Sequence, residues 1–181
     1  VDGIPYRPES GTHKAALELL TASGEIRLTD RWEYAAGKYA RLKFALLIPR
    51  PCRRFLLLDC MVEAECEIRL IQTLVPPPAS RFEVRKTAWT DNAMIFHCRT
   101  LREHSDFTQE LRWKNETAAE RKLGRKISFT STGTLALSFQ MAVNREFPAL
   151  PVAELRWNNR REWMKLWSAA LTVPELSEER C

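Results

Sequence analysis

The sequence has little of the residue types on which many catalytic and cofactor sites depend. Only three of its 181 residues are histidine and six are glycine, and no glycine-rich nucleotide loop, serine-hydrolase elbow or zinc-protease motif occurs. The five cysteines are an odd number without a CxxC pair, which indicates neither a disulfide framework nor a zinc ribbon. We therefore predict reduced thiols, no metal, no cofactor and no enzymatic activity.

Long hydrophobic runs are also missing. The longest apolar stretches, residues 44–49 and 55–58, are far shorter than the roughly 20 residues that a membrane-spanning helix needs. Apolar residues make up 45% of the chain and charged residues 28%, which is typical of a globular domain. We expect one domain that does not enter a membrane.

Hydrophobic periodicity predicts strands, a helix, more strands and a second helix. Alternation predicts strands over 38–48, 107–115 and 134–143, and a short apolar run predicts one over 54–60. Further candidate strands are 25–32, 81–90, 93–102 and 126–131. Apolar residues spaced by three and four predict helices over 62–75, before three prolines, and over 152–172. Residues 13–22 suit either a strand or a helix, and 116–125 reads as a charged connection. This order predicts an α+β fold with antiparallel sheets.

The cations outnumber the acids and are unevenly placed. The net charge is +5, the isoelectric point is about 9.1, and 20 of the 28 cations are arginine. Residues 36–54 and 121–145 contain cations and no acid. Cations that alternate along a strand can follow a phosphate backbone, and an interleaved aromatic ring can stack on a base. The competing interpretation is a solvated strand face.

These patterns predict an RNA-binding surface. Its candidate residues are Lys14, Lys38, Tyr39, Arg41, Lys43, Arg50, Arg53, Arg54, Arg112, Lys114, Arg121, Lys122, Arg125 and Lys126. The acid-free stretch predicts that six of them, at positions 38, 41, 43, 50, 53 and 54, form one basic patch.

The last predicted helix carries more apolar surface than one stripe. A helix that merely lies on its own domain needs a single apolar face, so the excess predicts an oligomer interface. The candidate interface residues are Leu155, Trp163, Met164, Leu166, Trp167 and Leu171.

Several short strings resemble the Whirly superfamily of single-stranded nucleic-acid-binding proteins. Residues 14–17 (KAAL) resemble the start of its first strand, and residues 64–74 resemble its first helix. Residues 133–140 resemble a late strand, and residues 151–155 resemble the entry to its final helix. The basicity is most similar to that of the kinetoplastid mitochondrial guide-RNA-binding proteins.

The resemblance implies a specific fold and function. The expected fold is two roughly four-stranded antiparallel sheets, each followed by a helix (ββββα twice). A 1–12 arm precedes the domain over 13–173, and a tail spans 174–181. The implied function is annealing of guide RNA to pre-mRNA in the mitochondrial matrix, within a heterotetramer containing a paralogous chain. Two alternatives stay open: an organellar single-stranded DNA-binding protein, and a β-sandwich interaction module without a nucleic-acid role.

Overall fold

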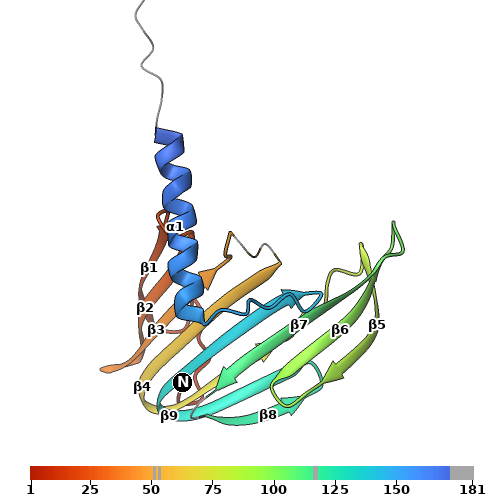
Figure 1. Ribbon diagram of the computed structural model, residues 1–181. Helices are drawn as coiled ribbons and strands as arrows, with labels where there is room; N and C mark the ends of the chain where they lie inside the picture. Colours follow the sequence, from red (N-terminus) through yellow and green to blue (C-terminus); the bar gives the residue numbers. More distant parts are fainter. Residues whose placement is uncertain (51, 53, 116–117, 172–181) are drawn as a thin grey trace, which may run out of the picture.

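The computed structural model describes residues 1–50, 52, 54–115 and 118–171, which form an antiparallel sheet and a C-terminal helix (Figure 1). Eight strands follow the spatial order β1-β2-β3-β4-β9-β7-β6-β5, and β8 pairs with β9 outside this path. The elements are β1 (Thr12–Leu20), β2 (Glu25–Ala35), β3 (Lys38–Leu47), β4 (Phe55–Thr73), β5 (Phe82–Trp89), β6 (Ala93–Thr100), β7 (Asp106–Asn115), β8 (Ala119–Leu123), β9 (Lys126–Val143) and α1 (Val152–Leu171).

The prediction of two ββββα units is wrong, because the helix expected over 62–75 is the distal half of strand β4. Apolar residues four apart fit both a helix and a strand, so their spacing could not separate the two. Burial along the segment does separate a strand from a helix, because Val62, Ala64 and Ile68 are buried whereas Glu65 and Glu67 are exposed. This period of two is that of a strand with one face in the core.

Strand β9 bends sharply and folds the sheet onto itself. Phe129 and Phe139 are ten residues apart, which is about 33 Å along a straight strand. Their ring centroids are nevertheless only 5.9 Å apart. The bend lies near Gly133, which has a φ of +83° and follows a register shift in the β4–β9 pairing. The molecule is therefore a β-sandwich. The second half of β4 and the first half of β9, with β8, cover the inner face of the sheet.

Other expected boundaries change for the same reason. The strands expected over 126–131 and 134–143 are the two halves of β9, and the charged connection contains β8. The ambiguous segment 13–22 lies mostly in β1, and the strand expected over 54–60 is the first half of β4. The antiparallel pairing and the C-terminal helix are confirmed.

The main core lies inside the fold of the sheet. It contains Ile127 and Phe129 from the first half of β9, which pack with Trp32 from β2, Phe96 from β6 and Trp113 from β7. Four cysteines among the described residues are free thiols, as expected. Burial raises the pKa of the Cys60 thiol to about 12, which makes this thiol a poor nucleophile at neutral pH.

Helix α1 packs on one end of the opposite, outer face. Leu155 completes a second apolar cluster with Leu47, Phe55 and Leu57. The side chain of Asn159 is fully buried; its Oδ1 accepts from the Arg50 amide at 2.9 Å, and its Nδ2 donates to the Ser23 carbonyl. Further along, the Trp167 indole donates to the Thr21 carbonyl at 2.7 Å. The helix is thus fixed to the β1–β2 turn by polar contacts as well as by packing.

Gly24 sets how closely this turn approaches the helix. It has a φ of +61°, and a Cβ at this position would overlap the indole of Trp163. Gly37, in the β2–β3 turn, has a similar φ of +70° but open space around it. The two glycines therefore share the same backbone requirement, and only Gly24 has a steric one.

We predict that Gly24→Ala loosens α1 whereas Gly37→Ala does not. Each substitution places a side chain in the left-handed region at a cost of about 1–2 kcal/mol. Gly24→Ala should cost more, because the Trp163 indole must also move. Urea unfolding gives both costs, and amide exchange of residues 155–167 reports the helix. Equal costs and equal exchange in the two variants would contradict the packing described here.

Candidate functional site

The outer face of strands β1–β4 is exposed and charged. The odd-numbered residues of β3 from 39 to 45 lie on it, opposite the odd-numbered residues of β2. One row across the sheet reads Lys14, Arg31, Arg41 and Glu63, in adjacent strands and direct register. Lys14 and Arg41 are among the residues predicted from the sequence, whereas Arg31, which lies between them, is not.

A charged groove of about 720 Å³ lies on this face beside the first turns of α1. Its floor is formed by β3, β4 and β9, with β1, β2 and β7 contributing at the sides. Its lining combines apolar residues, among them Ala45, Met61, Ala136 and Val152, with side chains that form hydrogen bonds, namely Glu18, Glu25, Arg27, Thr29, Lys43, Asp59, Lys114, Ser138 and Arg156. The groove therefore offers both donors and acceptors on rigid strands.

Arg156 closes one end of the charged groove. Its guanidinium donates to Asp59 at 2.5 Å and to Glu25 at 3.4 Å. Glu25 is buried and also accepts from Arg27 at 2.6 Å. These bonds join α1 to β2 and β4 and hold both carboxylates in place.

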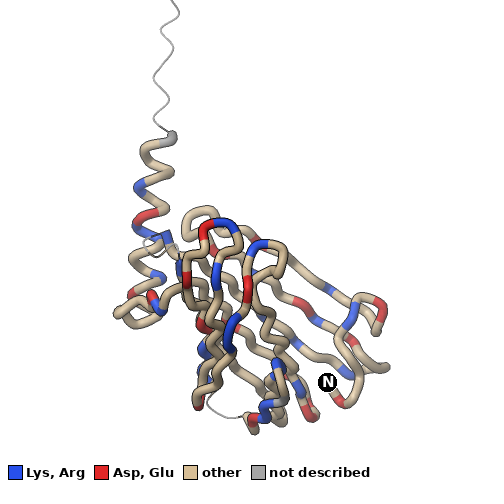
Figure 2. Tube along the Cα trace, turned by 90° about the vertical axis from the view of Figure 1, so that its right-hand side faces the viewer, with Lys and Arg blue, Asp and Glu red and all other residues tan. Residues whose placement is uncertain are grey.

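The predicted RNA-binding residues do not form one surface. Lys14, Tyr39, Arg41 and Lys43 share the outer face, and Lys114 lines the charged groove. The others are dispersed, and acids lie among the cations over the sheet rather than apart from them (Figure 2).

The six-residue basic patch expected around residues 38–54 is divided. Lys38 pairs with Asp2 at 3.5 Å, and Arg54 pairs with Glu146 at 2.6 Å. Arg50 lies by α1, its guanidinium 5.3 Å from the Trp163 ring centroid. Arg53 lies outside the described residues. Arg41 and Lys43 alone remain together on the outer face.

The remaining candidates have local partners or lie near the β8–β9 turn. Arg112 pairs with Glu110 at 2.6 Å and stacks on Phe147. Lys122 donates to the carbonyls of Thr90 and Asp91, which fixes β8 to the loop before β6. Three further cations at that turn are exposed: Arg121, Arg125 and Lys126.

The expected oligomer interface is partly internal to the chain. Leu155 is 2% exposed because it fills the second core cluster, so it is not a surface residue. Trp163 is half-buried against Gly24, whereas Met164, Leu166 and Trp167 are exposed. Leu171 is the last residue of α1.

An apolar groove of about 600 Å³ runs between the exposed tryptophan side of α1 and the ends of β1–β3. It is lined mainly by Leu19, Ile26, Leu46, Ile48, Trp163 and Trp167. The helix side of this groove was predicted from the sequence. The strand side was missed, because residues 13–22 suited a helix as well as a strand, and the alternation around Ile26 and Leu46 does not show where the core ends along a strand.

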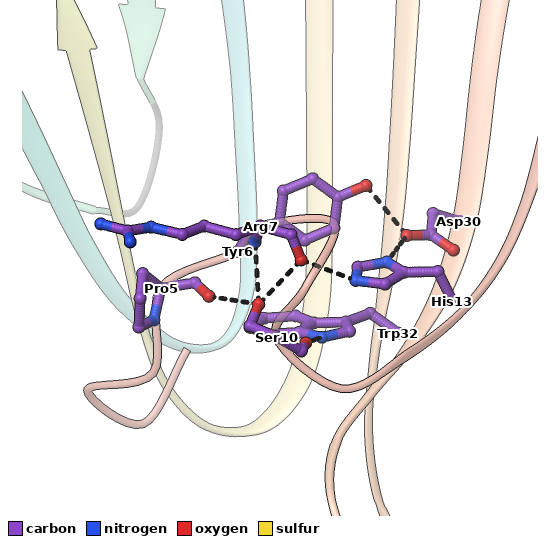
Figure 3. A network of polar contacts seen from close by, with 7 residues as sticks. All are labelled: Pro5, Tyr6, Arg7, Ser10, His13, Asp30 and Trp32. Atoms are coloured by element: carbon purple, nitrogen blue, oxygen red, sulfur yellow. Dashed lines mark hydrogen bonds and ion pairs between the residues drawn. The ribbon is translucent and has the colours of Figure 1, made fainter.

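A second polar cluster holds the N-terminal arm on the edge of the sheet (Figure 3). The buried Asp30 accepts from the Tyr6 hydroxyl at 2.9 Å and contacts Nδ1 of His13 at 2.6 Å. The other ring nitrogen of His13 lies 2.9 Å from the Arg7 carbonyl. The indole of Trp32 donates to the Ser10 carbonyl. These contacts join the arm to strands β1 and β2 and hold it against the sheet.

Within residues 1–50, 52, 54–115 and 118–171, no three His, Cys, Asp or Glu side chains gather as metal ligands. No helix in the same part of the chain is both long and apolar enough to cross a bilayer.

Comparison with known proteins relates the chain to others by fold alone. No protein-family model matches it, and no curated protein does. A solved structure described as a putative kojibiose phosphorylase from human microbiome superposes with a TM-score of 0.65 at 10% identity. This likeness covers 87% of the chain and 25% of that structure. A second structure, described as a heparinase III, gives 0.50 at 8% identity and covers 72% and 21%. The chain thus spans about a quarter of either structure or less.

We predict that the arm cluster makes stability depend on pH. The hydrogen bond that the His13 ring donates to the Asp30 carboxylate raises the pKa of His13 above its ordinary value of 6.5. A raised pKa in the folded state stabilises the fold fully below about 6.5 and loses that contribution as the pH rises through the raised value. The urea unfolding free energy of the parent should therefore fall above pH 6.5 relative to His13→Gln. Tyr6→Phe keeps the His13–Asp30 contact, so its unfolding free energy should change with pH as that of the parent does. If the unfolding free energies of the parent and of His13→Gln change with pH in the same way, the proposed coupling is wrong.

Proposed function

We propose that this chain is the β-sandwich domain of a carbohydrate-active enzyme, where it binds saccharide and packs against the domain that carries the catalytic residues. The fold supports this proposal, since two solved structures with the same fold are named as a phosphorylase of kojibiose and a heparinase. A fold alone does not fix a function, and two surfaces of this chain support the proposal further.

The observation that carries the proposal is the apolar groove. Leu19 is 66% exposed, Ile48 52% and Trp167 39%, and they line one continuous surface. A contiguous apolar surface of this kind on a folded domain marks a contact with another protein surface. In a fold that makes up a quarter of a longer solved chain, a neighbouring domain is the simplest occupant.

The charged groove supplies the saccharide contact. Sugar hydroxyls both donate and accept, and they pair well with fixed carboxylates, guanidinium groups and side-chain hydroxyls. Thr29 and Ser138 lie in the groove between charged neighbours on strands whose register holds them in place. The groove volume of about 720 Å³ suits a ligand of a few sugar units.

Guide-RNA annealing within a heterotetramer followed from a Whirly fold, which this chain does not have. RNA or DNA binding, a mitochondrial location and the absence of enzymatic activity stay predictions. The outer-face cations favour an anionic ligand of some kind and do not by themselves select RNA.

We predict that the apolar groove is an adhesive surface. The parent should bind a hydrophobic dye such as anilinonaphthalene sulfonate and associate with itself at high concentration. Leu19→Asn with Ile48→Asn should reduce both without lowering the melting temperature, because both side chains are exposed. The matched control is Ile71→Asn with Leu150→Asn, which changes two exposed apolar residues outside the groove. A monomeric parent without dye binding would contradict the proposed contact.

We predict weak binding of neutral saccharides in the charged groove. Saturation-transfer NMR with kojibiose and with starch oligosaccharides should show contact with the parent. Thr29→Val with Ser138→Ala should weaken affinity about five- to thirtyfold, since two hydrogen bonds of about 1 kcal/mol each are lost. Thr73→Val with Thr132→Val, on exposed strand positions elsewhere, is the control. If no saccharide contacts the parent, the carbohydrate role is wrong.

A further inference from the structure

The row of cations on the outer face has an arrangement that a solvated sheet surface does not need. Lys14, Arg31 and Arg41 lie directly opposite one another on β1, β2 and β3. Directly opposed side chains have Cβ atoms about 4.5–5.5 Å apart, and like charges at this distance destabilise a sheet. We call these three residues the cation row.

The surrounding acids do not neutralise the row. Among the described residues, no carboxylate forms an ion pair with Lys14, Arg31 or Arg41. Glu63 continues the row on β4, and Glu33 accepts from the Gly37 amide instead. Lys43 lies two residues beyond Arg41 on the same face and connects the row to the charged groove. The row is therefore a cationic extension of that groove.

Arg31 is held in place for binding. Its guanidinium lies 4.0 Å from the ring centroid of Tyr39, so that it stacks on the ring. A stacked guanidinium keeps its edge donors free and loses less freedom when it binds an oxyanion.

We propose that the cation row binds the oxyanion groups, such as sulfate, of an acidic saccharide chain that enters the charged groove. An oxyanion would offset the repulsion between the three cations and accept charge-assisted hydrogen bonds from them. Three adjacent strands span about 10 Å, which is a suitable length for successive charged groups on one chain. The choice of a saccharide rests on the proposed function.

A nucleic acid fits the same surface less well. Single-stranded binders combine a cationic path with exposed aromatic rings on which bases stack. Tyr39 is the aromatic residue beside the row, and Arg31 already covers its ring. Glu33 and Glu63 also border the row, and they interrupt a longer path for phosphates.

Heparin fragments and oligouridylate of equal charge, titrated at several salt concentrations, test the proposal. The parent should bind the heparin fragment more tightly than oligouridylate. Lys14→Ala with Arg41→Ala should weaken heparin binding about tenfold or more and reduce the salt slope by about two, because fewer counterions are released. Removing the two cations that face Arg31 should not destabilise the fold, because it relieves repulsion between like charges. The melting temperature of this variant checks that the fold is intact.

The control variant is Arg121→Ala with Lys126→Ala, which removes the same charge from exposed positions on β8 and β9. An equal loss in this variant would show charge attraction without a site and overturn the proposal. Tighter binding of oligouridylate would overturn it in favour of a nucleic acid, and full displacement of heparin by inorganic phosphate at constant ionic strength would assign the row to a free ion. If the parent contacts neutral saccharides but does not bind heparin, this inference is wrong and the proposed function still stands.

Discussion

The bend in β9 is the constraint on which the rest of the molecule depends. It brings Phe129 onto Phe139 and closes the sheet over Trp32, Phe96 and Trp113. The inner face of the sheet is thereby covered along part of its length, and the outer face remains free for the charged groove and for α1. Where the cover ends, Leu17 and Leu19 on the edge strand β1 stay exposed. The covered core and the exposed apolar groove thus have one geometric cause.

Helix α1 separates the two grooves and helps to build both. Its first turns place Arg156 against Glu25 and Asp59 at the end of the charged groove. Its later turns place Trp163 and Trp167 along the apolar groove. One helix can serve two chemically different surfaces because its polar and aromatic residues occupy different turns.

The sheet register explains why charge counted along the chain misled the site prediction. Residues 36–54 contain no acid, but the partners of a strand residue come from neighbouring strands. Arg41 thus lies between Arg31 and Glu63, which are ten and twenty-two residues away in sequence. Arg54 finds Glu146 in the same way. The acid-free stretch was real, and the acid-free surface was not.

The sequence by itself determined the alternation of β3, β7 and the second half of β9, the C-terminal helix and the absence of a long apolar span, because these depend on local period and composition. It did not separate the distal half of β4 from a helix, since apolar residues four apart satisfy both periods. Only the tertiary structure decided the bend at Gly133, the meeting of Lys14, Arg31 and Arg41, and the burial of Asp30 and Asn159. Each of these depends on contacts between residues distant in sequence, which are fixed by strand register and by folding of the sheet onto itself.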